Sequence, residues 1–403
     1  MTSSRHRTTT DVDVRAVDPD RADRSAREVS AGAHFASLDG YRAVAAIMVL
    51  LTHVAYSTGA VVTGTAGHVL GRFDFGVPLF FLMSGFLLYR PWVRASLEGR
   101  TRPGVRRYAL RRAARILPLY WVVVVFTLLL LPEIRPVAPS QWWVHLLGLQ
   151  IYQVQGAIEG LSQTWSLCTE ISFYVVLPFL GAAALGRRRR WVRDPLRRQL
   201  YLLAGMAVAA LGFQTLKVWT DVLPLQAGYW LPFFLDWFAA GMGLAVLEVR
   251  SRLADPPRLV RAAMTLGADP WTSLVIAGSC FVTAVTPLGG SYDFTPTAPW
   301  ETMFKHWLYL GCAFFLLLPG VLGGRGWTKA LARPVPHRLG LISYGIFLWH
   351  LVLLRMLMPF LHIPFFSGQG LVVAAVLVPV TIAIATVTYR LVERPAQRWA
   401  HRV

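Results

Sequence analysis

Residues 38–62 read LDGYRAVAAIMVLLTHVAYSTGAVV, in which a short polar signature precedes an apolar run from Ala43 to Val62. About 20 such residues suffice for a helix to cross the hydrocarbon core of a bilayer. The run contains one readily ionisable side chain, His53. An imidazole inside a bilayer costs free energy unless it faces a bundle interior or a watery cavity, so His53 is a candidate functional residue. A structural hydrogen bond to a neighbouring helix is the competing interpretation.

The rest of the chain repeats this apolar character. Of its 403 residues 55% are hydrophobic and 15% are charged, and the mean hydropathy is +0.48. Apolar windows of spanning length recur along nearly the whole sequence, so the composition indicates a polytopic membrane protein and not a soluble domain with one anchor. Fifteen tryptophans and thirteen tyrosines fit belts at the two membrane interfaces. The first partner that the sequence predicts is therefore the lipid bilayer.

The net charge of +19 is concentrated in short connectors between apolar windows. The first basic connector contains Arg90, Arg94, Arg100, Arg102, Arg106, Arg107, Arg111, Arg112 and Arg115, and the second contains Arg187 to Arg190, Arg193, Arg197 and Arg198. Short loops this basic are expected on the cytoplasmic side, where they also suit anionic lipid. This distribution does not indicate nucleic-acid binding. The three cysteines fall in apolar stretches without metal-ligand spacing, so neither a metal site nor a disulfide framework is predicted.

The apolar windows predict an all-α fold, a transmembrane bundle of about ten spanning helices. We expect these helices near residues 41–62, 72–90, 116–132, 165–185, 199–216, 226–247, 270–286, 302–322, 339–360 and 370–389. The segment 141–155 is too short to span, and counting it would place basic connectors on both sides of the membrane. We therefore predict a short interfacial or re-entrant helix there, on the outer side. Ten spans predict a multi-pass protein of the cell membrane with both termini in the cytoplasm.

Three regions are expected along the chain. Residues 1–36, rich in Arg, Asp, Ser and Thr, are predicted to form a disordered cytoplasmic tail. Residues 37–396 form the transmembrane domain, and residues 397–403 form a cytoplasmic C-terminal tail. No apolar signal-peptide region precedes Ala43, so we expect the first span to act as an uncleaved insertion signal.

A second costly group, Glu170, lies in the window 165–185. Counting residues from the membrane faces puts His53 roughly 12 Å and Glu170 roughly 8 Å from the outer face of a core of about 30 Å. The two side chains are therefore predicted to meet. A carboxylate bonded to one imidazole nitrogen orients the ring and leaves the other nitrogen to accept a hydroxyl proton. A structural Glu–His pair that joins two helices is the alternative.

Several other residues could contribute to a site. Arg112 and Arg115, three apart at the start of a span, project on one face of a helix, and such guanidinium pairs suit phosphate groups. Marking of the cytoplasmic side alone also explains basic residues here. Arg42 either pairs with a neighbouring carboxylate or binds an anionic ligand. Asp236 and His350 lie mid-span and either line a cavity or form helix–helix bonds.

The chain resembles the acyltransferase-3 family of integral membrane acyltransferases over roughly residues 36–396. The matching stretches are LDGYR (38–42) with His53, VPLFFLMSGF (77–86), RAARILPLY (112–120), WSL (165–167) with Glu170 and Tyr174, ISYGIFLWH (342–350) and ERP (393–395). Each motif is weak alone, but their order and spacing together are specific. Members of similar short architecture from actinomycetes acylate macrolide sugars, and this chain is similar to that group.

The resemblance implies transfer of an acyl group, often acetyl, from cytoplasmic acyl-CoA (acetyl-CoA) to a hydroxyl of a sugar-containing acceptor, without a metal. It implies that His53 and the Arg112–Arg115 pair are needed for activity, with Glu170 as the partner of His53 and Arg42 as a further donor-binding residue. Further candidate substrate-binding residues are Trp165, Tyr174 and Tyr344, together with the mid-span residues Asp236 and His350. His53 either deprotonates the acceptor hydroxyl or carries the acyl group itself.

The rival interpretation is a proton-coupled transporter or exporter, in which His53, Glu170, Asp236 and His350 form a relay. Buried His and Glu side chains serve both interpretations equally. The arginine pair favours the enzyme because a proton relay does not need a phosphate site. A second class of membrane acyltransferases, the MBOAT type, is a poorer match because its Asn/His arrangement is not found in the sequence.

Overall fold

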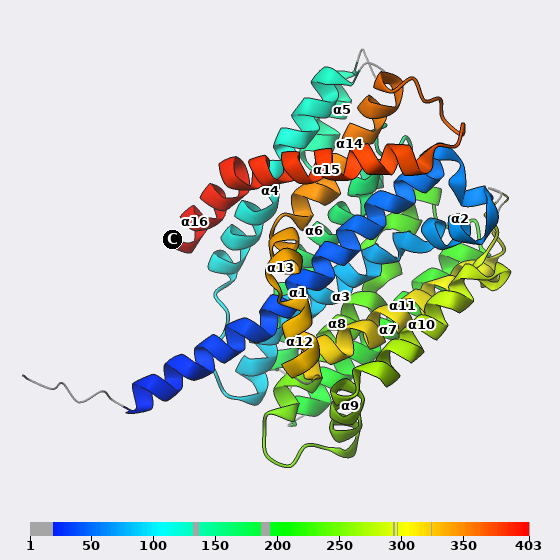
Figure 1. Cartoon of the computed structure of the whole chain (residues 1–403). Helices are drawn as coiled ribbons and strands as arrows, with labels where there is room; N and C mark the ends of the chain where they lie inside the picture. Colours follow the sequence, from blue (N-terminus) through cyan, green and yellow to red (C-terminus); the bar gives the residue numbers. More distant parts are fainter. Residues whose placement is uncertain are drawn as a thin grey trace, which may run out of the picture.

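The computed structural model describes residues 19–131, 137–186, 194–292, 295, 297–323 and 325–402. All regular structure in these residues is helical, which confirms the predicted all-α class (Figure 1). The first half contains α1 (Pro19–Thr58), η1 (Ala60–Val62), α2 (Gly64–Gly71), η2 (Arg72–Phe75), α3 (Gly76–Leu97), α4 (Val105–Leu130), α5 (Pro139–Leu146), η4 (Gln150–Tyr152), η5 (Ser162–Thr164) and α6 (Trp165–Leu185). The second half contains α7 (Pro195–Trp219), η6 (Leu225–Tyr229), η7 (Leu231–Phe234), α8 (Leu235–Ser251), α9 (Arg258–Ala268), α10 (Pro270–Val285), η8 (Pro287–Gly289), α11 (Pro299–Leu322), α12 (Arg325–Leu331), α13 (Pro334–Leu341), α14 (Ser343–Phe360), α15 (Gly370–Thr388), η9 (Tyr389–Glu393) and α16 (Arg394–Arg402).

Nine helical stretches in the described residues are long and apolar enough to cross a membrane. A tenth arises if α9 and α10, which meet at 90°, count as one broken span. The break follows from the sequence: the Asp269 carboxylate accepts the backbone N–H groups of Trp271 and Thr272, and Pro270 begins the new helix. Each of the ten predicted windows falls on one of these stretches. The chain is therefore a multi-pass membrane protein, and the segment 141–155 holds only the short elements α5 and η4.

The two ends of the chain bear on the predicted tails. Residues 1–18 lie outside the described residues, and α1 begins at Pro19, so the second half of the predicted N-terminal tail has helical backbone. The C-terminal residues from Arg394 to Arg402 form α16. In the second basic connector, Arg187 to Arg190 and Arg193 also lie outside the described residues. The cytoplasmic location of both tails stays a prediction.

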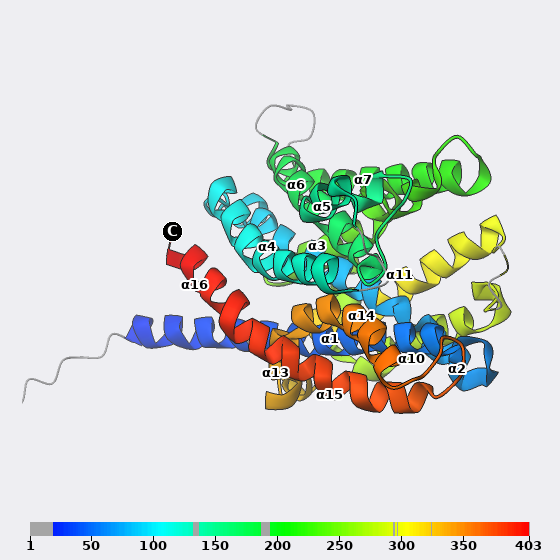
Figure 2. The same ribbon diagram turned by 90° about the horizontal axis from the view of Figure 1, so that it is seen from above.

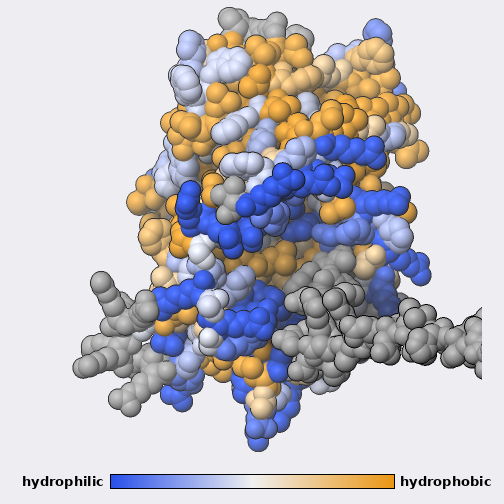
Figure 3. Space-filling model, turned by 90° about the vertical axis from the view of Figure 1, so that its left-hand side faces the viewer, coloured by the Kyte–Doolittle hydropathy of each residue, from blue (hydrophilic) through white to orange (hydrophobic). Residues whose placement is uncertain are grey.

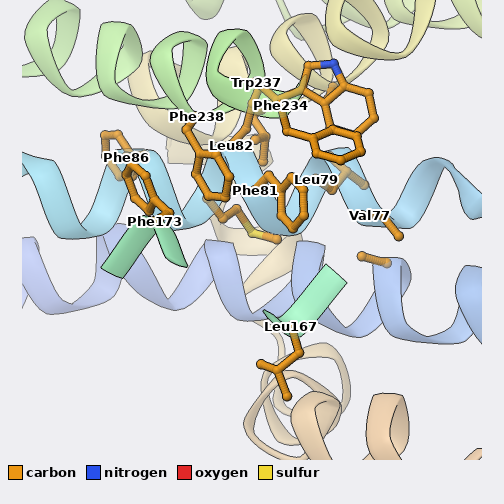
Figure 4. Close-up of a cluster of buried hydrophobic side chains, with 14 of the residues drawn as sticks. Val77, Leu79, Phe81, Leu82, Phe86, Leu167, Phe173, Phe234, Trp237 and Phe238 are labelled. Carbon is orange, nitrogen blue, oxygen red and sulfur yellow. The ribbon is translucent and has the colours of Figure 1, made fainter. Parts of the chain in front are cut away.

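The core is closest packed where α3 crosses α8. A Cβ atom added to Gly85 of α3 would lie 2.4 Å from the Phe238 oxygen, and one on Gly241 of α8 would lie 2.0 Å from a backbone oxygen of α3. Small residues thus bring the two backbones into direct contact, as is common between membrane helices. Beside this crossing the rings of Phe81, Phe238 and Phe173 stack at centroid distances of 4.6 and 4.0 Å (Figure 4). This aromatic column ties α3 to α8 and α6.

Helix α1 runs through the middle of the bundle. Seen from above, it lies between α13 and α15 on one side and α3, α4 and α6 on the other (Figure 2). Its Tyr41 hydroxyl donates to the Leu316 carbonyl of α11 at 2.6 Å and accepts from the Trp327 indole of α12 at 2.8 Å. These bonds fix one end of α1, so the polar residues along the helix, Arg42 and His53 among them, are held inside the protein.

The surface divides into an apolar and a polar part. In Figure 3 hydrophobic side chains cover the upper part of one face, and hydrophilic side chains gather in its middle and lower parts. The lower end is the one that holds α9 and α12 in Figure 1. Such a division is expected of a bundle whose apolar belt lies in lipid and whose basic end lies in water.

Candidate active site

Three of the cavities in the described part of the chain lie along α1. Arg42 lines an inner cavity of about 80 Å³, and His53 lines two outer cavities of about 270 and 370 Å³. His53 follows Arg42 by eleven residues on one helix, which is roughly 16 Å at 1.5 Å per residue. Trp165, the first residue of α6, also lines both outer cavities. A single helix thus connects a cavity that holds guanidinium groups with cavities that hold an imidazole.

The hydrogen bonds of His53 define which of its nitrogens can act as a base. Its Nδ1 lies 2.7 Å from the Val49 carbonyl oxygen, which can only accept, so Nδ1 carries the proton. The same Nδ1 lies 3.4 Å from Nε2 of His350. In a neutral ring the lone pair is then on Nε2. His53 is half-buried and lines two cavities, so this arrangement suits proton acceptance from a bound hydroxyl.

His350 lies behind His53. It is fully buried in α14, and its ring centroid is 5.0 Å from that of His53. Its Nδ1 is 3.2 Å from the Ile346 carbonyl oxygen and therefore donates, which leaves Nε2 to accept from His53. Of the two interpretations left open for His350, the structure shows a helix–helix contact, and that contact is made with His53 itself.

The inner cavity brings the three predicted arginines together. Arg42 of α1 and both Arg112 and Arg115 of α4 line it. Asp39 accepts from Arg42 at 3.1 Å, so one guanidinium is already paired with a carboxylate. Arg112 and Arg115 are three residues apart on α4 and therefore face the same way. Three positively charged side chains therefore line one small cavity.

Glu170 lies in the inner cavity and not beside His53. Its carboxylate accepts from the Ser84 hydroxyl of α3 and, at 2.5 Å, from the Tyr174 hydroxyl one turn further along α6. The cavity wall also contains Arg42 and Arg115. The predicted contact between Glu170 and His53 is therefore wrong, and the carboxylate lies at the depth of the arginines.

Glu170 lies deeper than predicted because the residue count assumed that α6 begins at the outer face of the membrane. Gln163 and Thr164, which directly precede α6, are 2% and 0% exposed. The Gln163 amide donates to the Leu348 carbonyl of α14 at 3.0 Å. The helix therefore begins inside the bundle, and five further residues carry Glu170 past His53 towards the inner cavity.

The aromatic candidates divide between the cavities. Tyr174 and Tyr344 line the inner cavity, and the Tyr344 hydroxyl donates to the Ile116 carbonyl at 2.9 Å. Trp165 lies on the outer side, tilted against the ring of Tyr229 at a centroid distance of 5.2 Å. Of the predicted substrate-binding residues, these three reach a cavity wall.

Asp236 forms a helix–helix bond. Its Oδ2 lies 2.8 Å from Nε2 of His306 in α11, and it accepts from the Gln214 amide of α7 at 3.2 Å. These bonds join α7, α8 and α11. His306 lines the outer cavity of about 270 Å³, so Asp236 borders that cavity through its partner.

The same outer cavity contains polar residues that the sequence motifs do not identify. Asp74 of η2 accepts from the Tyr309 hydroxyl of α11, and Lys305 of α11 lines the cavity beside them. Both charged residues lie within windows predicted to span the membrane, 72–90 and 302–322. That position was the signal that could have identified them, since intramembrane charges are functional candidates.

Comparison with known proteins identifies the family of this chain. The profile of the acyltransferase-3 family, described as an acyltransferase domain, matches residues 35–390. The chain belongs to the acyltransferase-3 family. As a member it is a membrane acyltransferase, which decides for the enzyme over the proton-coupled transporter. All of the matching motifs except residues 393–395 lie in or next to α1, α3, α4, α6 and α14, and these five helices meet around the cavity that Arg42 lines.

Individual relatives of this acyltransferase are distant. The peptidoglycan O-acetyltransferase OatA of Listeria monocytogenes is 24% identical over 393 residues, which cover 90% of this chain and 56% of OatA. A proposed O-acetyltransferase of Staphylococcus aureus, SACOL0978, is 24% identical over 389 residues, with 90% and 57% covered. A proposed membrane-bound transacylase of Komagataeibacter xylinus, BcsY, is 26% identical over 395 residues, with 91% and 83% covered. The chain spans little more than half the length of the first two relatives, and no solved structure matches it.

Among the described residues, no group of three or more His, Cys, Asp or Glu side chains is arranged to hold a metal ion. Cys168, Cys280 and Cys312 are free thiols.

Proposed function

We propose that this acyltransferase moves an acyl group, in the first instance acetyl, from acyl-CoA to a hydroxyl of a carbohydrate or glycosylated acceptor. The observation that carries the proposal is the position of His53 on α1. Its imidazole lines the outer cavities, while Arg42, eleven residues earlier on the same helix, lines the arginine cavity. A donor held by its phosphates at one level can place its thioester at the other.

The inner cavity is the proposed donor site. Guanidinium groups bind phosphate through paired, charge-assisted hydrogen bonds, and CoA carries several phosphates. Arg112 and Arg115 supply such a pair, and Arg42 supplies a third positive group. Glu170 is assigned to this site as a neighbouring carboxylate, with Ser84 and Tyr174 as its hydrogen-bond partners. Its role would be to limit the positive charge of the cavity and not to orient His53.

His53 is the proposed reacting residue. With its proton on Nδ1, Nε2 accepts the proton of the acceptor hydroxyl while the oxygen attacks the thioester carbonyl. The resulting tetrahedral intermediate expels the CoA thiolate, which recovers the proton. In a two-step route Nε2 itself attacks the thioester carbonyl and the C–S bond breaks to release the CoA thiolate. The acceptor oxygen then attacks the acyl-imidazole, its proton passes to the thiolate or to water, and the C–N bond breaks to restore His53. Both routes use the same atom, and ping-pong kinetics distinguishes the second.

The comparisons support the acceptor class and the basic residues support the orientation. OatA is named as a peptidoglycan O-acetyltransferase, and the glycan part of peptidoglycan offers sugar hydroxyls. The connector between α3 and α4, together with the first two turns of α4, contains five arginines from Arg100 to Arg111, and short basic segments at the membrane boundary are cytoplasmic. We therefore place the arginine cavity towards the cytoplasm, both termini on that side, and the acceptor on the opposite side of His53.

The test uses the purified chain in lipid nanodiscs with radiolabelled acetyl-CoA. Acetyl-CoA should raise the melting temperature of the wild type, and His53→Ala should retain this shift while transfer falls by about 10²- to 10⁴-fold. The Arg112→Ala/Arg115→Ala double variant should lose the shift. Arg106→Ala removes an exposed arginine of the same helix and is the matched control. Full transfer by the His53→Ala protein would sink the proposal, as would the absence of an acetyl-CoA shift in the wild type.

A further inference from the structure

The larger outer cavity has a wall of unusual chemistry. This cavity has a volume of about 370 Å³, and we call it the glutamine chamber. Besides His53, its polar lining consists of Gln150, Gln155, Ser162, Gln163, Gln226 and Tyr229. In the part of the chain that the structure describes, no Asp, Glu, Lys or Arg lines it. Gln155 and Tyr229 are exposed, whereas Gln150 and Gln163 are buried. The chamber therefore descends from an exposed rim to a buried floor at the reacting histidine.

Gln163 lies at this floor, and one hydrogen bond fixes the orientation of its amide. Its Nε2 donates to the Leu348 carbonyl at 3.0 Å, and a carbonyl can only accept, so the orientation of the amide is fixed. The opposite atom, Oε1, is buried and has no hydrogen-bond partner among the described residues. The side chain is 2% exposed. A second glutamine shows the same arrangement.

Gln150 is oriented by a short chain of hydroxyl groups. The Thr164 hydroxyl gives its proton to the Leu161 carbonyl at 2.5 Å, so it accepts from Nε2 of Gln150 at 2.8 Å. Oε1 of Gln150 is also buried without a partner among the described residues, and the residue is 0% exposed. Buried acceptors without a donor are rare and costly in proteins. Both glutamines line the chamber, so a ligand with hydrogen-bond donors that packs against them would offer the missing partners.

Aromatic rings complete the chamber. Trp165 and Tyr229 lie 5.2 Å apart at 45° and both line it. Flat aromatic faces pack against the apolar C–H face of a sugar ring, while its hydroxyl groups point outward to amide oxygens. We propose that the glutamine chamber is the acceptor site and that it takes a neutral, polyhydroxylated sugar ring, whose reacting hydroxyl lies at His53. The inference rests on the proposed function only in taking His53 as the reacting residue.

The second outer cavity, of about 270 Å³, has a charged wall, unlike the glutamine chamber. Its wall contains the charged residues Asp74 and Lys305 together with His306. An acceptor that carries a carboxylate or phosphate would be held by Lys305 there, whereas the glutamine chamber offers such a group no cation among the described residues. A charged ring in a neutral, partly buried site loses its hydration without compensation. The assignment of the acceptor to the glutamine chamber therefore predicts selection against charged sugars.

Two matched probes test the inference with the unaltered full chain in detergent. Methyl β-D-glucopyranoside and methyl β-D-glucopyranosiduronate share one ring and differ by a carboxylate. Saturation-transfer-difference NMR should show binding of the glucoside and at least about tenfold weaker binding of the glucuronide. Equal or tighter binding of the glucuronide, or no binding of either probe, would overturn the inference. This comparison does not depend on whether any variant folds.

Variants then locate the probe. Gln150→Met and Gln163→Met keep the length of the side chain and remove the amide, and each should weaken glucoside binding by about three- to tenfold. Gln199→Met replaces a buried glutamine of α7 that lies outside the chamber, and Lys305→Met alters the other cavity; both should bind the glucoside as the wild type does. Loss of binding in Lys305→Met, or full binding in both chamber variants, would contradict the assignment.

Transfer of acetyl to the same glucoside is measured separately. Glutamine-dependent binding without transfer would refute the proposed function and leave the sugar site standing. Acetyl transfer that is unchanged in Gln150→Met and Gln163→Met would refute the sugar site and leave the proposed function standing.

Discussion

The contact between His53 and the buried His350 leads to a quantitative prediction. His350→Phe keeps a ring of similar size in α14 but removes the Nε2 atom that accepts from His53. The Val49 carbonyl, at 2.7 Å, still holds the Nδ1 proton, so the ring of His53 should keep its orientation. What is lost is the contact at 3.4 Å, which matters most when His53 becomes positively charged during transfer.

The size of the effect follows from this geometry. Hydrogen bonds to charged groups are worth about 1.5–3 kcal/mol and neutral ones about 0.5–1.5 kcal/mol, so a bond gains roughly 1 kcal/mol when His53 takes up a proton. The 3.4 Å separation is long, which favours the lower end of that range. A loss of about 1 kcal/mol in the transition state corresponds to roughly a fivefold lower kcat. His350→Gln, whose amide oxygen can accept, should recover part of it.

The assay compares kcat and KM for acetyl transfer by His350→Phe, His350→Gln and His53→Ala, with acetyl-CoA binding as a check on folding. His53→Ala should lose about 10²- to 10⁴-fold and His350→Phe about fivefold, with acetyl-CoA binding unchanged in both. A collapse in His350→Phe as deep as that in His53→Ala would make His350 the reacting residue. An unchanged kcat would show that the contact has no part in transfer. Either result refutes the reasoning.

Three further predictions concern stability, followed as thermal or denaturant unfolding in detergent. Glu248 is 1% exposed and accepts from Arg90 at 2.7 and 3.0 Å, so Glu248→Ala should cost about 3 kcal/mol. A loss below about 1 kcal/mol would contradict a buried ion pair. Gly241→Ala should cost about 1–3 kcal/mol because its Cβ would lie 2.0 Å from a backbone oxygen of α3. The control Gly205→Ala, whose Cβ would have nothing within 4 Å, should be neutral or stabilising. Equal effects of the two substitutions would refute the close packing of α3 on α8. Burial lowers the pKa of His145, whose Nε2 accepts the Ile158 N–H at 3.1 Å. The unfolded chain therefore binds this proton first, and stability should decline as pH falls below the ordinary value near 6.5, by at most about 1.4 kcal/mol per pH unit. In His145→Phe this part of the pH dependence should be absent, and an identical pH profile would exclude His145 as its source.

Much of the fold could be predicted because its signals are local. Each of the ten apolar windows reports the composition of one helix, and a spanning helix satisfies its own backbone hydrogen bonds. The Arg112–Arg115 pair was also predictable, since two residues three apart on a helix share a face wherever the helix is placed. A residue count alone was enough to predict that the segment 141–155 is too short to span the membrane.

Contacts between helices were less predictable, because depth was counted from assumed membrane faces. Glu170 was expected beside His53 because α6 was assumed to begin at the outer face. The buried Gln163 and Thr164 start the helix inside the bundle and move the carboxylate to the arginine cavity. His350 was flagged as buried and polar, but nothing in its sequence context named His53 as its partner.

The sequence by itself determined the membrane class, the helices, the reacting imidazole candidate and the arginine pair, because each depends on residues within one helix. Only the tertiary structure decided which nitrogen of His53 carries the proton, that His350 stands behind it, and that Glu170 belongs with the arginines. It also assembled the glutamine chamber from η4, η5, η6 and the loops beside them, which are short segments far apart in sequence. The physical reason is that hydrogen-bond partners and cavity walls depend on the height and rotation of each helix against its neighbours, and side-chain packing sets both.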